Sequence, residues 1–291
     1  MSEAPFASTL STAGFLSLAR GGFRPLQQVQ GTAVVSLGYQ RMPRGRGISR
    51  SLEAQVVPGA AWGGGSNIYM PRGGATVQEF LNTGTWSELA ERTKAYNDAR
   101  TLALSRLQDS ASKAGALAVV DVRVHRGRFG HARRAVEFTA LGTAVTSDRF
   151  EADEQDPVPL VGLSGTDFWK LVDSGVWPLG LVGGTSVVFI LSGYRTRRAR
   201  FRLSRRSFPT QEYQDYTNGL NSARFHASSR MREEATELGA SGVLGISVGL
   251  TPREQRDDNL IVTVEMLGTA VAPLERGAPR PVAYALGLGK S

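Results

Sequence analysis

Three side chains in the middle of the chain have the residue types of a divalent metal site. Asp121 and His125 are four residues apart on a predicted strand, so strand alternation places them on one face, and His131 follows across the turn. Two imidazoles and a carboxylate are sufficient types for Zn or Ni. A solvated hairpin end is the alternative interpretation. The second half of the chain has Gly245 and Gly249 at the equivalent positions, so only the first half could hold such a metal.

A run of arginines is the second candidate for chemistry. Seven of the twelve residues from 195 to 206 are arginine, and Arg198, Arg200 and Arg202 alternate with small or apolar residues. As a strand, this segment would present one cationic face, and arginine forks bind phosphate groups bidentately. The pattern predicts an anion-binding site with nucleic acid or an anionic lipid surface as partner. The alternative is an edge strand that its charges keep soluble.

Catalytic patterns are absent from the sequence. The chain has no cysteine and three histidines, which excludes disulfides, thiolate metal sites and a cysteine nucleophile. It has no phosphate-loop signature, no nucleophile elbow and no HExxH pattern. We therefore expect a protein that is not an enzyme. A divalent metal is the only cofactor that the residue types suggest.

The elements that must position these residues occur twice. The segment 15–25 matches 168–178 at an offset of 153, and the match continues from 29–35 into 182–188. A second block, around Ala99 and Leu107, repeats at an offset of 124, and the sequence LGTAV occurs at both 141–145 and 267–271. Three blocks in the same order indicate a tandem duplication.

Each repeat has the pattern of a strand, a long helix and two more strands. We expect the first helix to begin near Thr85, where Thr85 to Glu88 has the spacing of a capping box, and to end at Gly115. The glycine at 31 predicts either a close approach or a bulge inside the first strand. The predicted fold is α+β, with two tandem β-α-β-β domains, each a curved antiparallel sheet packed on one long helix.

The composition along the chain predicts where the domains, an insertion, a linker and a tail lie. The first domain is expected at 10–150 with an irregular insertion at 42–84, and the acidic stretch 151–160 is expected to be a linker. The second domain is expected at 161–274, followed by a loose tail at 275–291.

The segment 174–194 has no charged residue and is long enough for a membrane span, but its glycines and β-branched residues favour a strand. The first residues lack a basic region before a long apolar run. We therefore expect no transmembrane segment and a cytoplasmic protein.

The order of helix and strand motifs points to a family. The stretches 99–107, 114–120 and 142–145 resemble the YbjQ-like family, which is named for heavy-metal binding, and the second repeat resembles it at 223–231, 238–244 and 268–271. This resemblance implies a small β-α-β-β domain that assembles into rings, pentamers among its members. It implies no particular ligand residue, and the missing cysteine argues against soft-metal binding.

Closing a ring limits the number of two-domain chains that it can contain. Whole chains cannot fill one five-domain ring, because five is odd, so closure favours five chains in two stacked rings or three chains with six domains. The insertion on one repeat and the arginines on the other favour two layers. We predict a cyclic homo-oligomer of five chains with a non-enzymatic binding or scaffold role. The alternative function is an arginine-rich module for an anionic partner.

Overall fold

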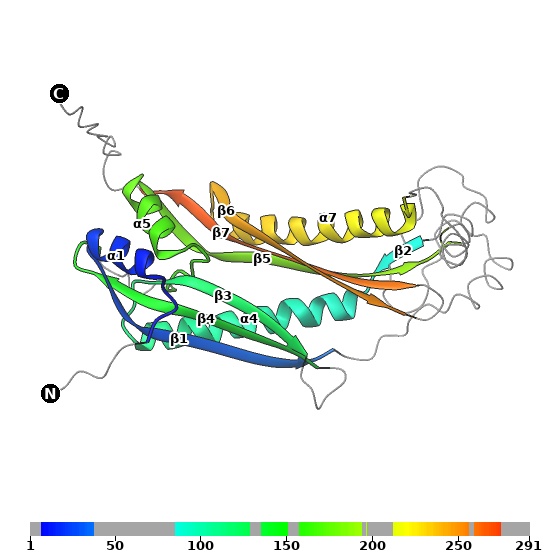
Figure 1. Cartoon of the computed structure of the whole chain (residues 1–291), viewed down its shortest axis with the longest axis horizontal. Helices are drawn as coiled ribbons and strands as arrows, with labels where there is room; N and C mark the ends of the chain where they lie inside the picture. The colour runs from blue at the N-terminus through cyan, green and yellow to red at the C-terminus, as the bar shows by residue number, and fades with distance from the viewer. Residues whose placement is uncertain are drawn as a thin grey trace, which may run out of the picture.

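The computed structural model describes residues 7–37, 85–128, 135–150, 157–193, 196, 212–255 and 259–274. Figure 1 shows its elements, which follow one another in the order α1 (Thr12–Arg20), β1 (Phe23–Ser36), β2 (Thr85–Glu88), α4 (Ala90–Lys113), β3 (Ala118–Arg128), β4 (Ala135–Ser147), α5 (Gly165–Asp173), β5 (Val176–Leu191), α7 (Gln214–Glu237), β6 (Gly242–Glu254) and β7 (Leu260–Pro273). The predicted insertion at 42–84, the tail at 275–291 and residues 151–156 of the predicted linker lie outside the described residues.

The strands form two antiparallel sheets. The first has the order β1-β4-β3, and the second has the order β2-β5-β7-β6. Each repeat contributes one long helix of 24 residues. The predicted α+β class with two sheets and their helices is confirmed.

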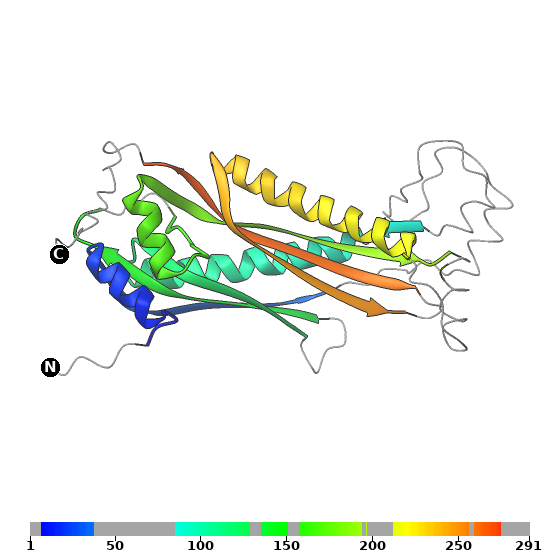
Figure 2. The same cartoon turned by 45° about the horizontal axis from the view of Figure 1, so that its top comes forward.

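The helix α4 lies between the two sheets, and α7 covers the opposite face of the second sheet (Figures 1 and 2). Alternation along β5 explains this arrangement. Val187 and Phe189 pack with Leu89 at the start of α4, whereas Val188 and Ile190 pack with the alanines of α7. The strand β5 is thus buried on both faces, which fits its nearly continuous apolar sequence.

Small residues let each helix lie close to its sheet. Ala99, Ala103, Leu107 and Ala111 share one face of α4 and have no exposed surface. A Cβ atom at Gly31 would clash with the backbone of α4, and one at Gly184 would clash with the backbone of α7. The predicted close approach at Gly31 is therefore confirmed. Gly115 and Gly239 take φ values of 68° and 69° just after the two helices, as expected for glycines that end a helix.

The predicted capping box is wrong. Thr85 to Glu88 form the strand β2, and α4 begins at Ala90 with Leu89 as an N-cap that makes no side-chain hydrogen bond. The alternation of polar and aromatic residues in this segment suits an edge strand, and tertiary contacts use the side chain of Glu88. These contacts outweigh the local cap that the spacing predicts.

The charge-free segment is the strand β5 rather than a membrane helix. Among the described helices, none combines the length and the apolar character that a membrane span requires.

Candidate functional site

The junction between the two repeats holds a connected set of polar contacts. The strand β2 precedes the helix of the first repeat but pairs with β5 of the second, from Thr85 opposite Leu191 to Glu88 opposite Val188. The first repeat therefore supplies the edge strand of the second repeat's sheet.

Glu88, at the end of β2, binds Arg230 of α7 through two parallel hydrogen bonds. Arg230 Nη1 donates to Glu88 Oε1 at 2.8 Å, and Nη2 donates to Oε2 at 2.9 Å. Ser186 Oγ also donates to the same carboxylate, at 2.6 Å. Arg230 Nη1 reaches the carbonyl oxygen of Thr185 at 3.3 Å as well. This two-fold contact fixes the angle between arginine and carboxylate, so it orients α7 against β2.

Beyond β2, side chains of α4 continue to satisfy the edge of β5. The amide of Val187 donates to Thr93 Oγ1 at 2.9 Å. The side-chain amide of Asn97 both donates to the carbonyl of Thr185 and accepts from its N–H, each at 3.0 Å. An exposed strand edge invites pairing with other chains, and here a helix covers it.

A buried arginine crosses the same interface further along. The side chain of Arg100 on α4 is 2% exposed and pairs with Glu234 of α7. The other oxygen of Glu234 accepts from the amide of Gly183 at 2.8 Å. Burying a guanidinium is costly unless it is paired, so this contact holds the two repeats in one relative position.

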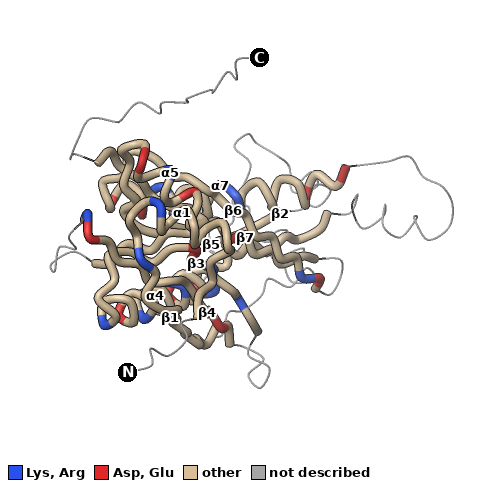
Figure 3. The backbone as a smooth tube through the Cα atoms, turned by 60° about the vertical axis from the view of Figure 1, so that its left-hand side comes forward, with Lys and Arg blue, Asp and Glu red and all other residues tan. Residues whose placement is uncertain are grey.

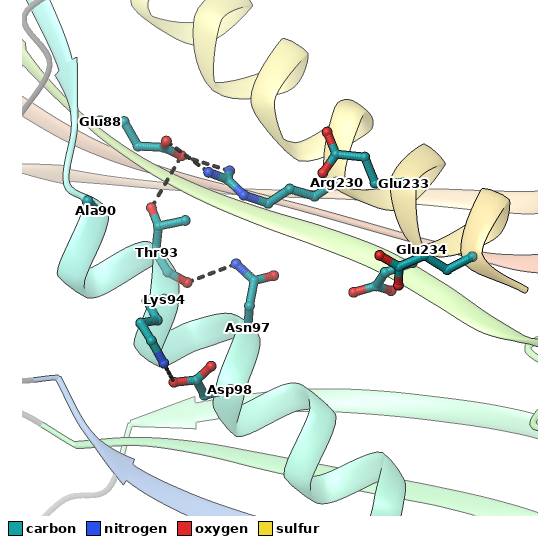
Figure 4. A pocket seen from close by; sticks show the side chains of 10 residues that line it. Glu88, Ala90, Thr93, Lys94, Asn97, Asp98, Arg230, Glu233 and Glu234 are labelled. Atoms are coloured by element: carbon teal, nitrogen blue, oxygen red, sulfur yellow. Dashed lines mark hydrogen bonds and ion pairs between the residues drawn. The ribbon is translucent and has the colours of Figure 1, made fainter.

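We refer to Glu88, Thr93, Asn97, Thr185, Val187 and Arg230, with their hydrogen bonds, as the joint. A pocket of about 360 Å³ opens beside it between α4 and α7 (Figure 4). Glu88, Thr93, Asn97 and Arg230 line this pocket together with Lys94, Asp98, Glu233, Glu234 and Glu237. The joint offers neither a nucleophile nor a paired base. Its chemistry is that of holding a strand edge and a carboxylate.

The pKa values of two carboxyl groups at the interface are shifted in opposite directions. Burial acts to raise the pKa of Glu88, but the hydrogen bonds from Arg230 and Ser186 and the nearby positive charge together hold the pKa of Glu88 below its ordinary value of 4.5. Burial raises the pKa of Glu265 on β7, although Arg126 lies 3.4 Å away and acts to lower it. Arg126 belongs to β3, so this second pair also links the two sheets.

The lowered pKa of Glu88 predicts how acid affects stability. A carboxyl whose pKa is lower in the folded state stabilises the fold above its ordinary pKa, and this stabilisation is lost as the pH falls through the folded value. We expect Glu88→Gln to lower the free energy of unfolding at pH ~7 by about 2 kcal/mol, as for a partly buried charged hydrogen bond. The difference from the wild type should shrink below pH ~4.5, where the wild type loses the same contribution.

Urea unfolding at neutral and acidic pH measures this difference. Glu91→Gln is a matched control, because Glu91 is an exposed acid in the first turn of α4. A difference between Glu88→Gln and wild type that stays constant down to pH ~3 would contradict the proposed role of the charge.

The predicted metal ligands are only partly described. Asp121 and His125 lie on β3, and His131 lies outside the described residues. Asp121 has a φ of 54° in a bulge, which interrupts the alternation that predicted a shared face, and its carboxylate pairs with Arg123 at 2.9 Å. Within the described parts of the chain, no three His, Asp or Glu side chains are placed to hold a metal ion. Without any cysteine, the residues do not fit a soft heavy metal, and the three-ligand site stays a prediction.

The arginine cluster with Arg198, Arg200 and Arg202 also lies outside the described residues, so its anion-binding role stays a prediction. Elsewhere on the described backbone, basic and acidic residues are interspersed (Figure 3). The described surface gives no support to the alternative function of binding an anionic partner.

Sequence reasoning missed the joint, although the sequence holds a signal for it. Thr93, Asn97 and Glu88 each have an identical residue 124 positions later, and two of the three are polar residues within a helix. Identical polar residues at matching positions of two diverged repeats indicate a shared contact rather than a solvated face.

Comparisons with known proteins agree with the duplicated fold. The YbjQ family model, whose description is "Putative heavy-metal-binding", matches residues 74–148 and 191–273, more than half of the chain. A protein of Mycobacterium tuberculosis named an encapsulin nanocompartment protein is 27% identical over 253 residues, which cover 86% of this chain and 79% of that protein. A UPF0145 protein of Thermoplasma acidophilum is 40% identical over 91 residues, 31% of this chain and 71% of its own length. A UPF0145 protein of Thermoplasma volcanium is 33% identical over 91 residues, 31% of this chain and 70% of its own length.

Proposed function

The chain belongs to the YbjQ family of "putative heavy-metal-binding" proteins, and from this premise we propose that it is a non-enzymatic binding or scaffold protein that assembles into a closed homo-oligomer. One observation carries the proposal. Surfaces that the repeats cover for each other inside the chain have a larger exposed fraction at the corresponding places of the first and last described elements.

The edge of β3 is covered within the chain. Residues 158–163, which lead into the second repeat, run along β3, with Val119 N–H donating to Pro159 at 2.9 Å and Val161 N–H donating to Val119 at 2.8 Å. The helix α5 follows and inserts Phe168 into the same region. Val120 and Val122 of β3 are 0% and 6% exposed as a result.

The edge of β6 is the counterpart of β3 and has no such cover in the described residues. Leu244 and Ile246 occupy the positions of Val120 and Val122 and are 42% and 51% exposed. Val248 and Leu250 extend this apolar row. A contiguous apolar surface on a strand edge is typical of an interface.

The matching lead segment stands at the other end of the chain. Residues 7–10 correspond to 160–163, and Thr9 N–H binds Thr143 Oγ1 at 3.0 Å just as Gly162 N–H binds Thr269 Oγ1 at 3.1 Å. Phe15 corresponds to the buried Phe168 but is 39% exposed. We propose that residues 7–10 and α1 of one chain cover β6 of the chain that precedes it in the ring. Such a head-to-tail contact generates a ring when its rotation closes.

The number of chains depends on where the repeats sit. The expected five chains in two stacked rings stay a prediction. The joint supports a different arrangement, because repeats that share a sheet edge belong side by side in one ring. A single ring built from whole two-repeat chains holds an even number of domains, and three chains would supply six. The name of the Mycobacterium tuberculosis relative, which refers to a nanocompartment, adds support for self-assembly.

The mass of the protein in solution tests the proposal. We expect mass photometry at micromolar concentration to give a fixed multiple of the chain mass. The double variant Leu244→Asp, Ile246→Asp should dissociate about 100-fold more readily, since it removes two apolar side chains from the contact.

Lys113→Asp is the control, because Lys113 in the last turn of α4 is exposed and the variant also carries an added negative charge. It should leave the mass unchanged. A wild type that is a single chain at micromolar concentration would refute the proposal.

A further inference from the structure

We infer that the outer edge of β1, together with Arg106 on α4, is a docking site for the first half of α7 from a second copy of this chain. The inference rests on the proposed function and names the contact that joins α7 of one chain to β1 of the next. Its geometry is that of the joint, repeated between chains.

The helix side of the joint is present twice. Glu88, Thr93 and Asn97 act on β5, and the second repeat has identical residues at the same offset of 124. These residues are Glu212, Thr217 and Asn221. The two helices also begin alike, with N-cap residues at φ −89°, ψ 82° and φ −92°, ψ 85°. The start of α7 therefore carries the same hydrogen-bonding groups in the same order as the start of α4.

The strand side of the joint is present twice as well. Thr185 and Val187 of β5 correspond to Thr32 and Val34 of β1, and Arg230 corresponds to Arg106. Arg106 Nη1 already donates to the carbonyl of Thr32, as Arg230 Nη1 donates to that of Thr185. Arg106 is thus held in the position in which its counterpart receives a carboxylate.

The residues on β5 are buried, whereas their counterparts on β1 are exposed to solvent. Thr185 and Val187 are 0% and 1% exposed, whereas Thr32 is exposed and Val34 is 45% exposed. Glu212, Asn221 and Arg106 are likewise exposed. In the first sheet as described, β1 is an edge strand whose only strand partner is β4. A complete set of groups for each half of the joint is therefore present in a different repeat of one chain, and in the described residues neither set meets its complement.

A second copy is the occupant that fits these groups best. The site needs a carboxylate for Arg106, a hydroxyl for the amide of Val34 and a side-chain amide for the backbone of Thr32. The start of α7 has all three at the spacing that the joint uses, and it is present in every copy at equal concentration. Because α7 and β1 lie in different repeats, the contact is head to tail and adds to the one proposed at β6.

Cross-linking tests this contact, and the absence of native cysteine gives it a clean background. Val34→Cys and Thr217→Cys reproduce the positions of Val187 and Thr93, whose backbone nitrogen and hydroxyl lie 2.9 Å apart. After mild oxidation, we expect a covalent dimer when the two single variants are mixed and none from either variant alone. A chain with both substitutions should form a ladder whose largest product reports the number of chains in the ring.

Charge reversal gives a second measurement. Arg106→Glu and Glu212→Arg should each weaken association at least about 10-fold, and the two together should restore it, since the pair is re-formed with opposite polarity. Lys113→Glu and Glu91→Arg are matched controls on exposed positions of α4 and should leave association unchanged.

The outcomes of these experiments distinguish the α7–β1 contact from the proposed assembly itself. Oligomers that dissociate in the β6 double variant but neither cross-link at 34 and 217 nor respond to the reversals would overturn this inference and leave the proposed function intact. A cross-link between two Val34→Cys chains would overturn the head-to-tail orientation. A wild type that stays a single chain would overturn both.

Discussion

Alanine at position 184 is expected to destabilise the chain by about 3 kcal/mol, the upper part of the range for overpacked cores. Gly184 lies on β5 where α7 crosses it, and a Cβ atom there would come well inside 3.0 Å of the carbonyl oxygen of Ala227. That oxygen belongs to the backbone of α7, so no change of side-chain rotamer relieves the clash. The helix must move away from the sheet and give up the packing of Val188 and Ile190.

Chemical denaturation measures the loss, and Gly180→Ala on the same strand is the control. A Cβ atom at Gly180 would meet only a side-chain carbon of Leu238, at 3.4 Å, so this variant should stay within about 1 kcal/mol of the wild type. Equal stabilities of the two variants would show that α7 does not lie as close to β5 as described.

Phe168→Ala is expected to cost about 3–5 kcal/mol, as for other fully buried aromatic residues. Phe168 has no exposed surface and packs with Leu18, Phe23 and Val120 of the first repeat. Its ring lies edge-on to that of Phe23, with centroids 5.1 Å apart. The substitution leaves a cavity between the repeats that the surrounding strands cannot fill.

Phe15→Ala, the equivalent change in the first repeat, should cost less than about 1 kcal/mol in a single chain, because Phe15 is 39% exposed. Both variants are best compared in the Leu244→Asp, Ile246→Asp background, where ring contacts do not contribute. In the wild-type background, Phe15→Ala should instead weaken association. If Phe15→Ala and Phe168→Ala lowered stability equally in the dissociated chain, the proposed difference between the covered and bare ends would be wrong.

The tandem repeat made most of the fold predictable from the sequence. The end of the first long helix at Gly115 is confirmed, because the positive φ of a helix-ending glycine is a local property. The start of α4 was predicted wrongly because the fate of Thr85 to Glu88 depends on β5, a strand 100 residues later. The bulge at Asp121 was missed as well. Its counterpart Gly245 has a φ of 63°, and one glycine at one of two equivalent positions is too weak a signal for a bulge.

The joint was missed for a related reason. A carboxylate, a threonine and an asparagine on one helix face are ordinary solvent-exposed residues when the helix is considered alone. They become a binding surface only because α4 lies between two sheets and meets the uncovered edge of β5. Sequence patterns predict which face of a helix is apolar, but not which strand edge its polar face will meet.

The placement of β2 also makes the two repeats depend on each other. By connectivity β2 belongs to the first repeat, and by hydrogen bonding it belongs to the second, so the two halves are interlocked and neither is a self-contained module. Covalent linkage turns this one contact into an intramolecular reaction with an effective concentration on the order of millimolar. The joint therefore persists at any dilution, whereas the contacts proposed between chains would obey mass action. In the proposed ring, the repeat pair rather than the single domain is thus the smallest unit that can join or leave.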